Sequence, residues 1–191
     1  MSDPSVDPTI VPPDVARLAE QVAERTDALR ERLDREAGRD VRLVAVTKAH
    51  PPTVAWAAAL AGHRDLGENY AQELAGKAEF LADRGVDVRC HMICPVQSNN
   101  VKLLAPLLGW WHTIDRAKLV RAVAARSPGA QVLIQRNLSG EPNKAGCATD
   151  EVEPLVEAAR QAGLEVLGPM GVATEGSAEL ATAEHPDAPG G

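Results

Sequence analysis

The side chain with the clearest chemical potential in this sequence is a lysine at the end of a β-branched run. Residues 41–47 precede Lys48, and the chain then breaks at two prolines. The run is typical of a strand buried on both faces, and alternation places Val44, Val46 and Lys48 on one face. Lys48 therefore leaves the sheet at its carboxyl end, where α/β folds place their chemistry. A lysine desolvated there can attack an aldehyde and form a Schiff base. The alternative is a lysine that closes a strand and points into water.

Other polar side chains follow the remaining expected strands. Asn69 comes after the second strand, and the later strand ends carry Gln97 to Asn99, Asp115, Asn137 and Ser139-Gly140. Each has a plain structural explanation, because Asn69 and Asp115 suit helix N-caps and Ser139-Gly140 suits a turn. Together they would gather at one edge of a parallel sheet. No dinucleotide fingerprint, P-loop or nucleophile elbow accompanies them.

Strands and helices must alternate to bring these residues together. A first helix is expected from Asp14, as N-cap, to Gly38. The expected strands span 41–47, 64–66, 88–93, 110–113, 130–136 and 164–168. The expected helices between them span 52–61, 69–83, 97–108, 115–126 and 150–162. Strict alternation with short connections predicts a parallel sheet, either doubly wound or an eight-stranded barrel.

Composition limits the classes of function. The 191 residues are 45% hydrophobic and 25% charged, with a net charge of −7 and no basic run, so a nucleic-acid surface is not indicated. The N-terminus shows no targeting signal and no run of about 20 apolar residues is present, which predicts a cytoplasmic protein. Cys90, Cys94 and Cys147 form no CxxC pair. They are interpreted as reduced, buried thiols, and no metal site is predicted.

Read in order, the strand-end residues resemble the YggS/PROSC-type pyridoxal phosphate homeostasis proteins. The motifs are VAVTKAHP, DLGENYAQE, HMICPVQSNN, HTIDR and VLIQRNLSGEPNKAG. The resemblance implies the alanine racemase N-terminal barrel, a (β/α)8 fold, and pyridoxal 5′-phosphate carried on Lys48 as an internal aldimine with Asn69 in the cofactor site. Among the other lysines, Lys102, Lys118 and Lys144 are expected on helices or in a turn, where solvent keeps an amine protonated.

The sequence also departs from the family pattern. Cys94 stands where the family has glycine, Arg136 where it tends to have an aliphatic residue, and Pro169 where it has leucine. The family's C-terminal third, which the resemblance makes responsible for strands seven and eight and for the phosphate loops, has no counterpart. Since a barrel takes about 250 residues, 191 fall about two βα units short.

The expected organisation is a disordered arm at 1–12, an incomplete barrel domain with about six of eight strands at 13–176, and a flexible tail at 177–191. Three functions compete: a carrier that holds or delivers pyridoxal phosphate to apo enzymes, an amino-acid racemase, and a remnant that binds nothing. The carrier is favoured, with no catalytic residue assigned, because no second proton-transfer residue is evident.

Overall fold

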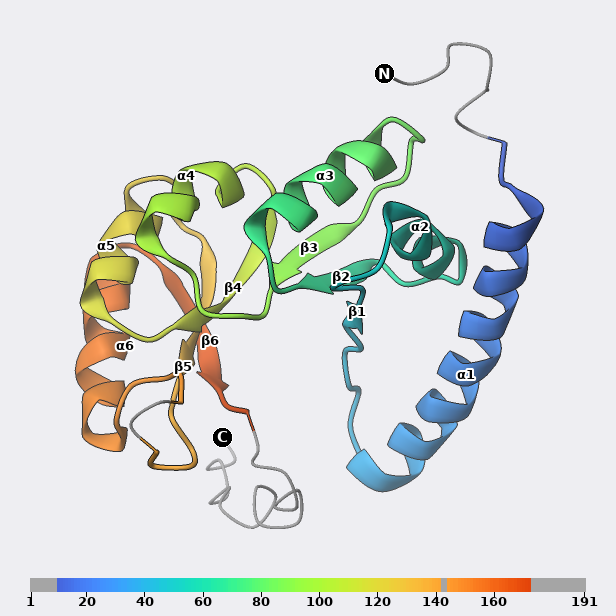
Figure 1. Cartoon of the computed structure of the whole chain (residues 1–191). Helices are drawn as coiled ribbons and strands as arrows, with labels where there is room; N and C mark the ends of the chain where they lie inside the picture. The colour runs from blue at the N-terminus through green and yellow to red at the C-terminus, as the bar shows by residue number, and fades with distance from the viewer. Residues whose placement is uncertain (1–9, 142–143, 173–191) are drawn as a thin grey trace. The chain divides into compact units, whose positions relative to one another are not determined.

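The computed structural model describes residues 10–141 and 144–172, which fall into two compact units (Figure 1). The first unit ends at Trp111 and the second begins at His112. Only residues 10–12 of the expected N-terminal arm are described, and the expected tail at 177–191 lies outside the described residues. No described helix is long and apolar enough to cross a membrane.

The first unit alternates helices and strands. Its elements are α1 (Pro13–Ala37), β1 (Ala45–Val46), α2 (Pro52–Leu60), β2 (Asp65–Glu68), α3 (Ala71–Ala82), β3 (Arg89–Met92), a 3-10 turn (Ser98–Asn100), α4 (Val101–Leu104) and the start of β4 (Leu108–Ile114). β1 pairs with β2, β2 with β3 and β3 with β4, each in parallel. The predicted α/β class is confirmed.

The core of the first unit is built around α2. This helix is apolar on every side, and residues 55–59 are all buried, as expected for a helix enclosed by other elements. α1 covers α2 through Val15 and Ala19, and Leu66 of β2 joins the same cluster. The edge of the Trp56 ring meets Phe80, with centroids 6.1 Å apart.

α1 ends at the residue that the sequence predicts, but its N-cap is a different residue from the predicted one. Gly38 adopts φ 62°, the left-handed conformation in which glycine ends helices at low cost. The predicted N-cap at Asp14 is wrong. Pro13 occupies the first helical position, where its missing N–H has no intrahelical partner, and Asp14 lies within the first turn.

β1 is shorter and more exposed than predicted. The expected strand at 41–47 reduces to Ala45–Val46, and Val46 is 48% exposed. Among the described strands β1 stands at the edge of the sheet and pairs with β2 alone. A strand with one neighbour has fewer groups to cover it, so the prediction of burial on both faces is wrong.

The expected helix at 97–108 is also corrected. A 3-10 turn and four-residue α4 replace it, and β4 begins at Leu108, ahead of Gly109. Pro106 prevents the helix from continuing, since proline has no N–H to donate to the carbonyl four residues earlier.

The second unit continues the alternation. It contains α5 (Ala117–Ala124), β5 (Gln131–Gln135), a 3-10 turn (Thr149–Glu151), α6 (Val152–Gln161) and β6 (Glu165–Met170), with β5 and β6 parallel. Its buried apolar residues include Leu119, Val123, Val132, Ile134 and Ala159. With β1 to β4, the described residues hold six strands that alternate with helices along the chain, as the sequence predicts.

Candidate functional site

The two predicted site residues lie at the carboxyl ends of adjacent strands in the first unit. Lys48 is in the turn two residues after β1, and Asn69 follows β2 directly. Ala45 pairs with Leu66 and Val46 with Gly67, and the N–H of Thr47 continues the ladder by donating to the Gly67 carbonyl at 3.0 Å. Since both strands are parallel and in register, Lys48 and Asn69 lie at the same edge.

The predicted alternation of faces is seen up to the turn. A methyl group built on Gly67 would lie 3.1 Å from Val44 Cγ1 and 3.4 Å from Val46 Cγ2, so these valines share one face. Ala45 packs against the core cluster on the opposite face. Thr47 follows Ala45 there and is buried beside α3.

Lys48 itself is exposed, so the expectation that its amine is desolvated is wrong. The reason is the one that exposes Val46: among the described strands, β1 has a neighbour on one side only. Asn69 is half-buried, and the predicted role of Asn69 as N-cap of α3 is wrong, because Tyr70 holds that position and no side chain caps it. The amide of Asn69 is therefore not committed to α3.

A buried charge network lies directly behind the Lys48 turn. Lys77 of α3 donates to Glu68 Oε1 at 2.7 Å and to the Thr47 carbonyl oxygen at 2.7 Å. The Thr47 hydroxyl donates to the same Glu68 oxygen at 2.6 Å. The Lys77 and Glu68 side chains are 6% and 3% exposed, so the pair is shielded from water.

A second carboxylate from α3 reaches the other side of the turn. Glu73 Oε2 accepts a hydrogen bond from the Ala49 N–H at 3.0 Å and lies 3.4 Å from Lys77 Nζ. The hydrogen bond from the Ala49 N–H is the main cause that lowers the pKa of Glu73, and Lys77 lowers it further. This carboxyl is therefore ionised at neutral pH. Ala49 has φ 59°, a left-handed conformation that is uncommon for a residue with a Cβ.

Lys77 was not predicted as a functional residue, although its position carried a signal. It stands three residues after Leu74 and four before Leu81, both fully buried. Residues at these spacings share one face of a helix, so a lysine among them must point inward. A buried ammonium then requires a carboxylate partner, and Glu68 is the nearby acidic residue that provides it.

Strand ends later in the chain carry self-contained turns. In the second unit, Asn137 Oδ1 accepts from the N–H groups of Ser139 and Gly140, each at 3.1 Å. These N–H groups are thus already bound within the turn.

The predicted N-cap role of Asp115 is wrong, since Arg116 holds that position and Asp115 pairs with it.

The amino end of β2 carries a different buried carboxylate. Asp65 receives two hydrogen bonds from Arg89, at 2.8 and 2.9 Å, and one contact at 2.8 Å with His91 Nε2. Burial opposes ionisation of Asp65, but the bonds from Arg89 and His91 outweigh it and lower its pKa. Burial lowers the pKa of His91, so its ring is neutral and donates to Asp65.

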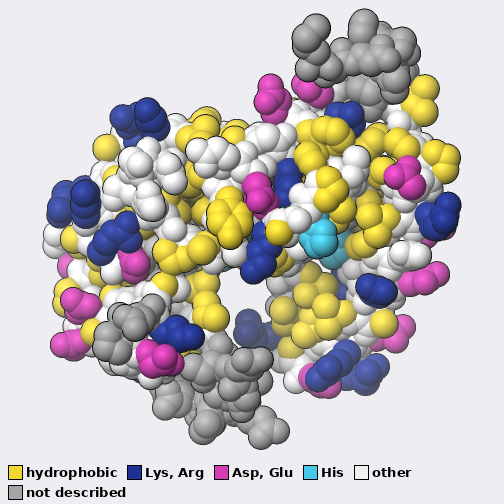
Figure 2. All heavy atoms as spheres, in the orientation of Figure 1, with side chains coloured by type: hydrophobic (Ala, Val, Ile, Leu, Met, Phe, Trp, Pro, Cys, Tyr) yellow, Lys and Arg dark blue, Asp and Glu magenta, His cyan; other side chains and the backbone are white. Residues whose placement is uncertain are grey.

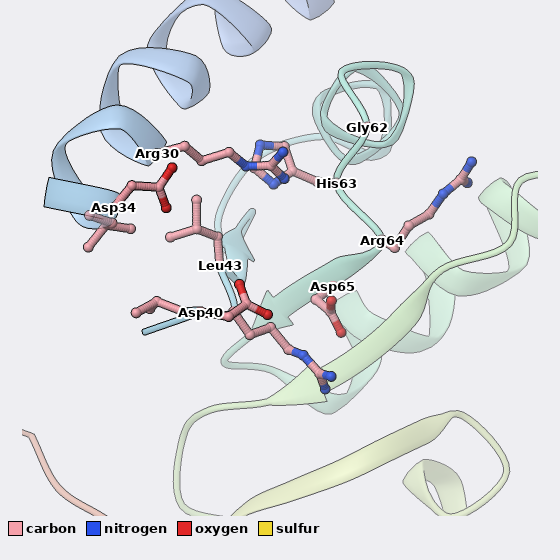
Figure 3. A pocket seen from close by; sticks show the side chains of 11 residues that line it. Arg30, Asp34, Asp40, Leu43, Gly62, His63, Arg64 and Asp65 are labelled. Carbon is pink, nitrogen blue, oxygen red and sulfur yellow. The ribbon is translucent and has the colours of Figure 1, made fainter. Parts of the chain in front are cut away.

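One pocket of the described residues also lies at this amino end (Figure 3), and Lys48 is not among the residues that line it. It has a volume of about 410 Å³. Arg30, Asp34, Asp40, His63, Arg64 and Asp65 are among its lining residues. Lysine is absent from this lining, so the pocket offers no amine to an aldehyde.

Charges elsewhere are dispersed. Figure 2 shows Lys and Arg side chains interspersed with Asp and Glu on the face that it draws, without a large basic patch. Cys90 and Cys147 are buried as predicted, while Cys94 is half-buried. Burial raises the pKa of Cys90 to about 11, and the negative charge of Glu68 makes a smaller contribution in the same direction.

Comparisons with known proteins agree on one family. Residues 19–184 match the family model "Alanine racemase, N-terminal domain". The chain is 38% identical over 154 residues to the "Pyridoxal phosphate homeostasis protein" of Pseudomonas aeruginosa, covering 77% of this chain and 66% of the relative. The protein of the same description in Escherichia coli K12 is 35% identical over 150 residues, covering 76% and 64%.

Solved structures give the same result. PipY of Synechococcus elongatus, without pyridoxal phosphate, aligns with a TM-score of 0.72 at 28% identity, covering 85% of this chain and 76% of PipY. PipY with pyridoxal phosphate bound aligns with a TM-score of 0.69 at 26% identity, with the same coverage. Alanine racemase of Bacillus anthracis shares the fold, with a TM-score of 0.60 at 17% identity over 82% of this chain and 39% of the racemase.

The matched region therefore confirms the predicted barrel type and the predicted resemblance. The chain spans 66% and 64% of the length of the two curated relatives described above. It belongs to the alanine racemase N-terminal domain family and is a relative of the pyridoxal phosphate homeostasis proteins.

Proposed function

We propose that this chain binds pyridoxal 5′-phosphate through a Schiff base on Lys48 and serves the homeostasis of that cofactor. The position of Lys48 carries the proposal: an exposed amine at the carboxyl end of β1, beside Asn69 at the end of β2. Relatives described as pyridoxal phosphate homeostasis proteins, and the PipY structure that contains the cofactor, support it.

Among the five lysines of the chain, Lys48 is exposed like Lys102, Lys118 and Lys144, and its position at the end of a strand distinguishes it from them. Lys77 lies close by, but all three of its donor directions are taken by Thr47, Glu68 and Glu73. Lys102 and Lys118 lie on α4 and α5, and Lys144 lies in a turn. The cofactor would supply an electrophilic aldehyde, and Lys48 the attacking amine.

Asn69 would complete the contact from the neighbouring strand. Its half-buried amide can both donate and accept hydrogen bonds, and the register places it next to the turn of Lys48. We assign it to orientation of the cofactor.

We expect the chain to bind the phosphate group of the cofactor weakly. A tight phosphate site needs several free N–H groups, each charge-assisted bond contributing roughly 1.5–3 kcal/mol. The Ser139-Gly140 turn, the glycine-serine substitute that the sequence offers, has its N–H groups bound by Asn137. We therefore expect this 191-residue polypeptide to bind pyridoxal phosphate on the order of a hundredfold to ten-thousandfold more weakly than a full-length relative, as the loss of two such bonds implies.

Borohydride reduction followed by peptide mapping tests the linkage. Pyridoxal phosphate and borohydride should label Lys48, and the label should vanish in Lys48→Ala but persist in the matched variant Lys102→Ala. Label that moves to another lysine in wild-type protein, leaving Lys48 unmodified, would contradict the proposal.

A parallel titration tests the phosphate argument. Visible absorbance is followed with pyridoxal phosphate and with pyridoxal, which lacks the phosphate. The two aldehydes should bind with similar, weak affinity. Stoichiometric, tight binding of the phosphorylated form alone would show a working phosphate site.

A carrier of this kind would act in the cytoplasm and pass the aldehyde to apo enzymes that use it. The exposure of Lys48 supports such a role, because a second amine can reach the linkage without unfolding the turn. Mixing loaded protein with an apo pyridoxal phosphate enzyme should restore that enzyme's activity at a rate above that of spontaneous release.

A further inference from the structure

We propose that Lys77 and Glu73 of α3 are positioning residues for Lys48, which they hold by binding the backbone on either side of it. Lys77 binds the carbonyl of residue 47, and Glu73 binds the N–H of residue 49. This inference rests on the proposed role of Lys48.

The two bonds enclose the lysine along the chain. Lys77 Nζ lies 2.7 Å from the Thr47 oxygen, and Glu73 Oε2 lies 3.0 Å from the Ala49 nitrogen. The peptide planes before and after Lys48 are thereby fixed to one helix. Fixing both planes fixes the direction in which the Lys48 side chain leaves the backbone, since its Cβ position follows from them.

Lys77 can hold its position because it is fully bound itself. Its buried ammonium contacts Glu68 at 2.7 Å and Glu73 at 3.4 Å in addition to the Thr47 carbonyl. Hydrogen bonds to ionised groups are shorter and stronger than neutral ones. Glu68 in turn accepts from the Thr47 hydroxyl, so the side chain and the carbonyl of Thr47 are both bound.

The backbone of the turn supplies one bond of its own, from the His50 N–H to the Thr47 carbonyl at 3.3 Å, and the Ala49 N–H is bound by the side chain of Glu73. β1 has two residues and, within the part of the chain that the structure describes, one neighbouring strand, and the ladder beyond it continues through one bond, from Thr47 to Gly67. Ala49 adopts φ 59°, which a residue with a Cβ adopts only when its surroundings favour it. The Glu73 carboxylate, aimed at the Ala49 N–H, supplies such a contact.

Variants of Glu73 provide the first test, because this side chain is 37% exposed and its truncation is therefore expected to leave the fold intact. Glu73→Ala removes the acceptor, Glu73→Gln keeps an acceptor without the charge, and Glu79→Ala is the matched control at an exposed site on the same helix. Hydrogen exchange at the Ala49 amide reports the bond without any cofactor.

We expect Ala49 to exchange at least tenfold faster in Glu73→Ala, with Glu73→Gln intermediate and Glu79→Ala unchanged. The rate at which borohydride traps pyridoxal phosphate on Lys48 should fall on the order of tenfold in Glu73→Ala, as misplacement of a reacting group implies. Partial rescue by Glu73→Gln separates positioning from a general loss of stability.

Lys77 is tested in a charge-free background. The double variant Lys77→Met, Glu68→Leu removes both buried charges, and its thermal unfolding shows whether it folds. It should trap the cofactor at Lys48 more slowly than wild type while retaining a cooperative transition. Unchanged Ala49 exchange and unchanged trapping in Glu73→Ala and in the folded double variant would overturn the inference. If wild-type Lys48 is not labelled at all, the proposed function fails instead, and Ala49 exchange alone decides whether the turn is held.

Discussion

β2 carries a buried carboxylate at each end, and the two ends are used differently. Asp65, at the amino end, binds Arg89 and His91 of the adjacent strand. Glu68, at the carboxyl end, binds Thr47 beyond β1 and Lys77 on α3. The first carboxylate joins strand to strand, whereas the second joins helix α3 to the turn that carries Lys48.

The two ends of β2 therefore differ in which groups their carboxylates bind. Both oxygens of Asp65 have partners on β3, and no partner is a backbone group of a turn. At the other end, Lys77 and Glu73 bind the backbone of residues 47 and 49. We therefore expect substitutions at the Asp65 end to change stability alone, and substitutions at the Glu68 end to change stability and the behaviour of Lys48 together.

The largest expected effect is that of Lys77→Met. It leaves Glu68 buried without a counter-charge, which should lower the free energy of unfolding by about 3–5 kcal/mol. Urea denaturation measures the loss. The double variant Lys77→Met, Glu68→Leu should recover most of it, because replacing both charges by apolar groups removes the unpaired carboxylate. Equal stability of the single variant and wild type would show that the pair is not shielded.

Asp65→Asn should have the next largest effect. An amide of the same shape keeps one acceptor but loses the charge that Arg89 and the buried His91 face, which should cost about 2–3 kcal/mol. Trapping of pyridoxal phosphate on Lys48 should not change in the folded protein. Asp83→Asn, at an exposed site after α3, serves as the control. A slower reaction of Lys48 in Asp65→Asn would remove the distinction between the two ends.

Acid should weaken the amino end first. The pKa of His91 is lowered by burial and that of His63 by burial and Arg30, so the folded protein resists protonation at these rings. The unfolded chain takes up these protons near pH 6.5, and stability should therefore fall as the pH drops below that value. The carboxylates of Asp65 and Glu73, whose pKa values are also lowered, add a further loss below about pH 4.5. Thermal unfolding of wild type and His91→Gln between pH 8 and 4 checks whether the histidines act before the carboxylates. The variant should lose part of the pH dependence of stability between pH 7 and 5 and keep the pH dependence below 4.5.

The smallest expected effect is at Ala49. Glycine adopts the left-handed conformation of residue 49 without the Cβ conflict, although it loses more backbone entropy on folding. Because relief of the conflict is the larger of the two effects, Ala49→Gly should raise the free energy of unfolding by about 0.5–1 kcal/mol. Ala61→Gly, at a residue with φ −72°, should lower it instead. Denaturation midpoints measured in parallel distinguish the two. A loss of stability in Ala49→Gly would mean that the turn is not strained.

The fold was predictable where local chemistry and burial agree. The glycine end of α1, the apolar α2 and the alternation of six strands with helices follow from periodicity and turn residues, whereas the choice of a barrel over a doubly wound sheet came from the family resemblance. The length of β1 could not be predicted in this way, because a β-branched run does not indicate how many neighbouring strands its strand has. The prediction of a helix over 97–108 is wrong because it places the helix end at Gly109, whereas the missing N–H of Pro106 interrupts the helix earlier.

The site was predictable only in part. Lys48 and Asn69 came from strand ends and family resemblance, and the structure places both at one edge of the sheet. Their use of cofactor remains a prediction. The support from Thr47, Glu68 and Lys77 joins residues up to 30 positions apart, and no local pattern specifies which buried lysine meets which carboxylate.

The separation between Thr47 and Lys77 also has a kinetic consequence. Their bond spans 30 residues, so it forms only after β1, α2, β2 and α3 have closed on one another. Contacts that depend on such loop closure are made late, and their loss mainly accelerates unfolding. Lys48 should thus reach its final orientation at the end of folding, and a chain emerging during synthesis would present an ordinary flexible lysine until α3 is in place.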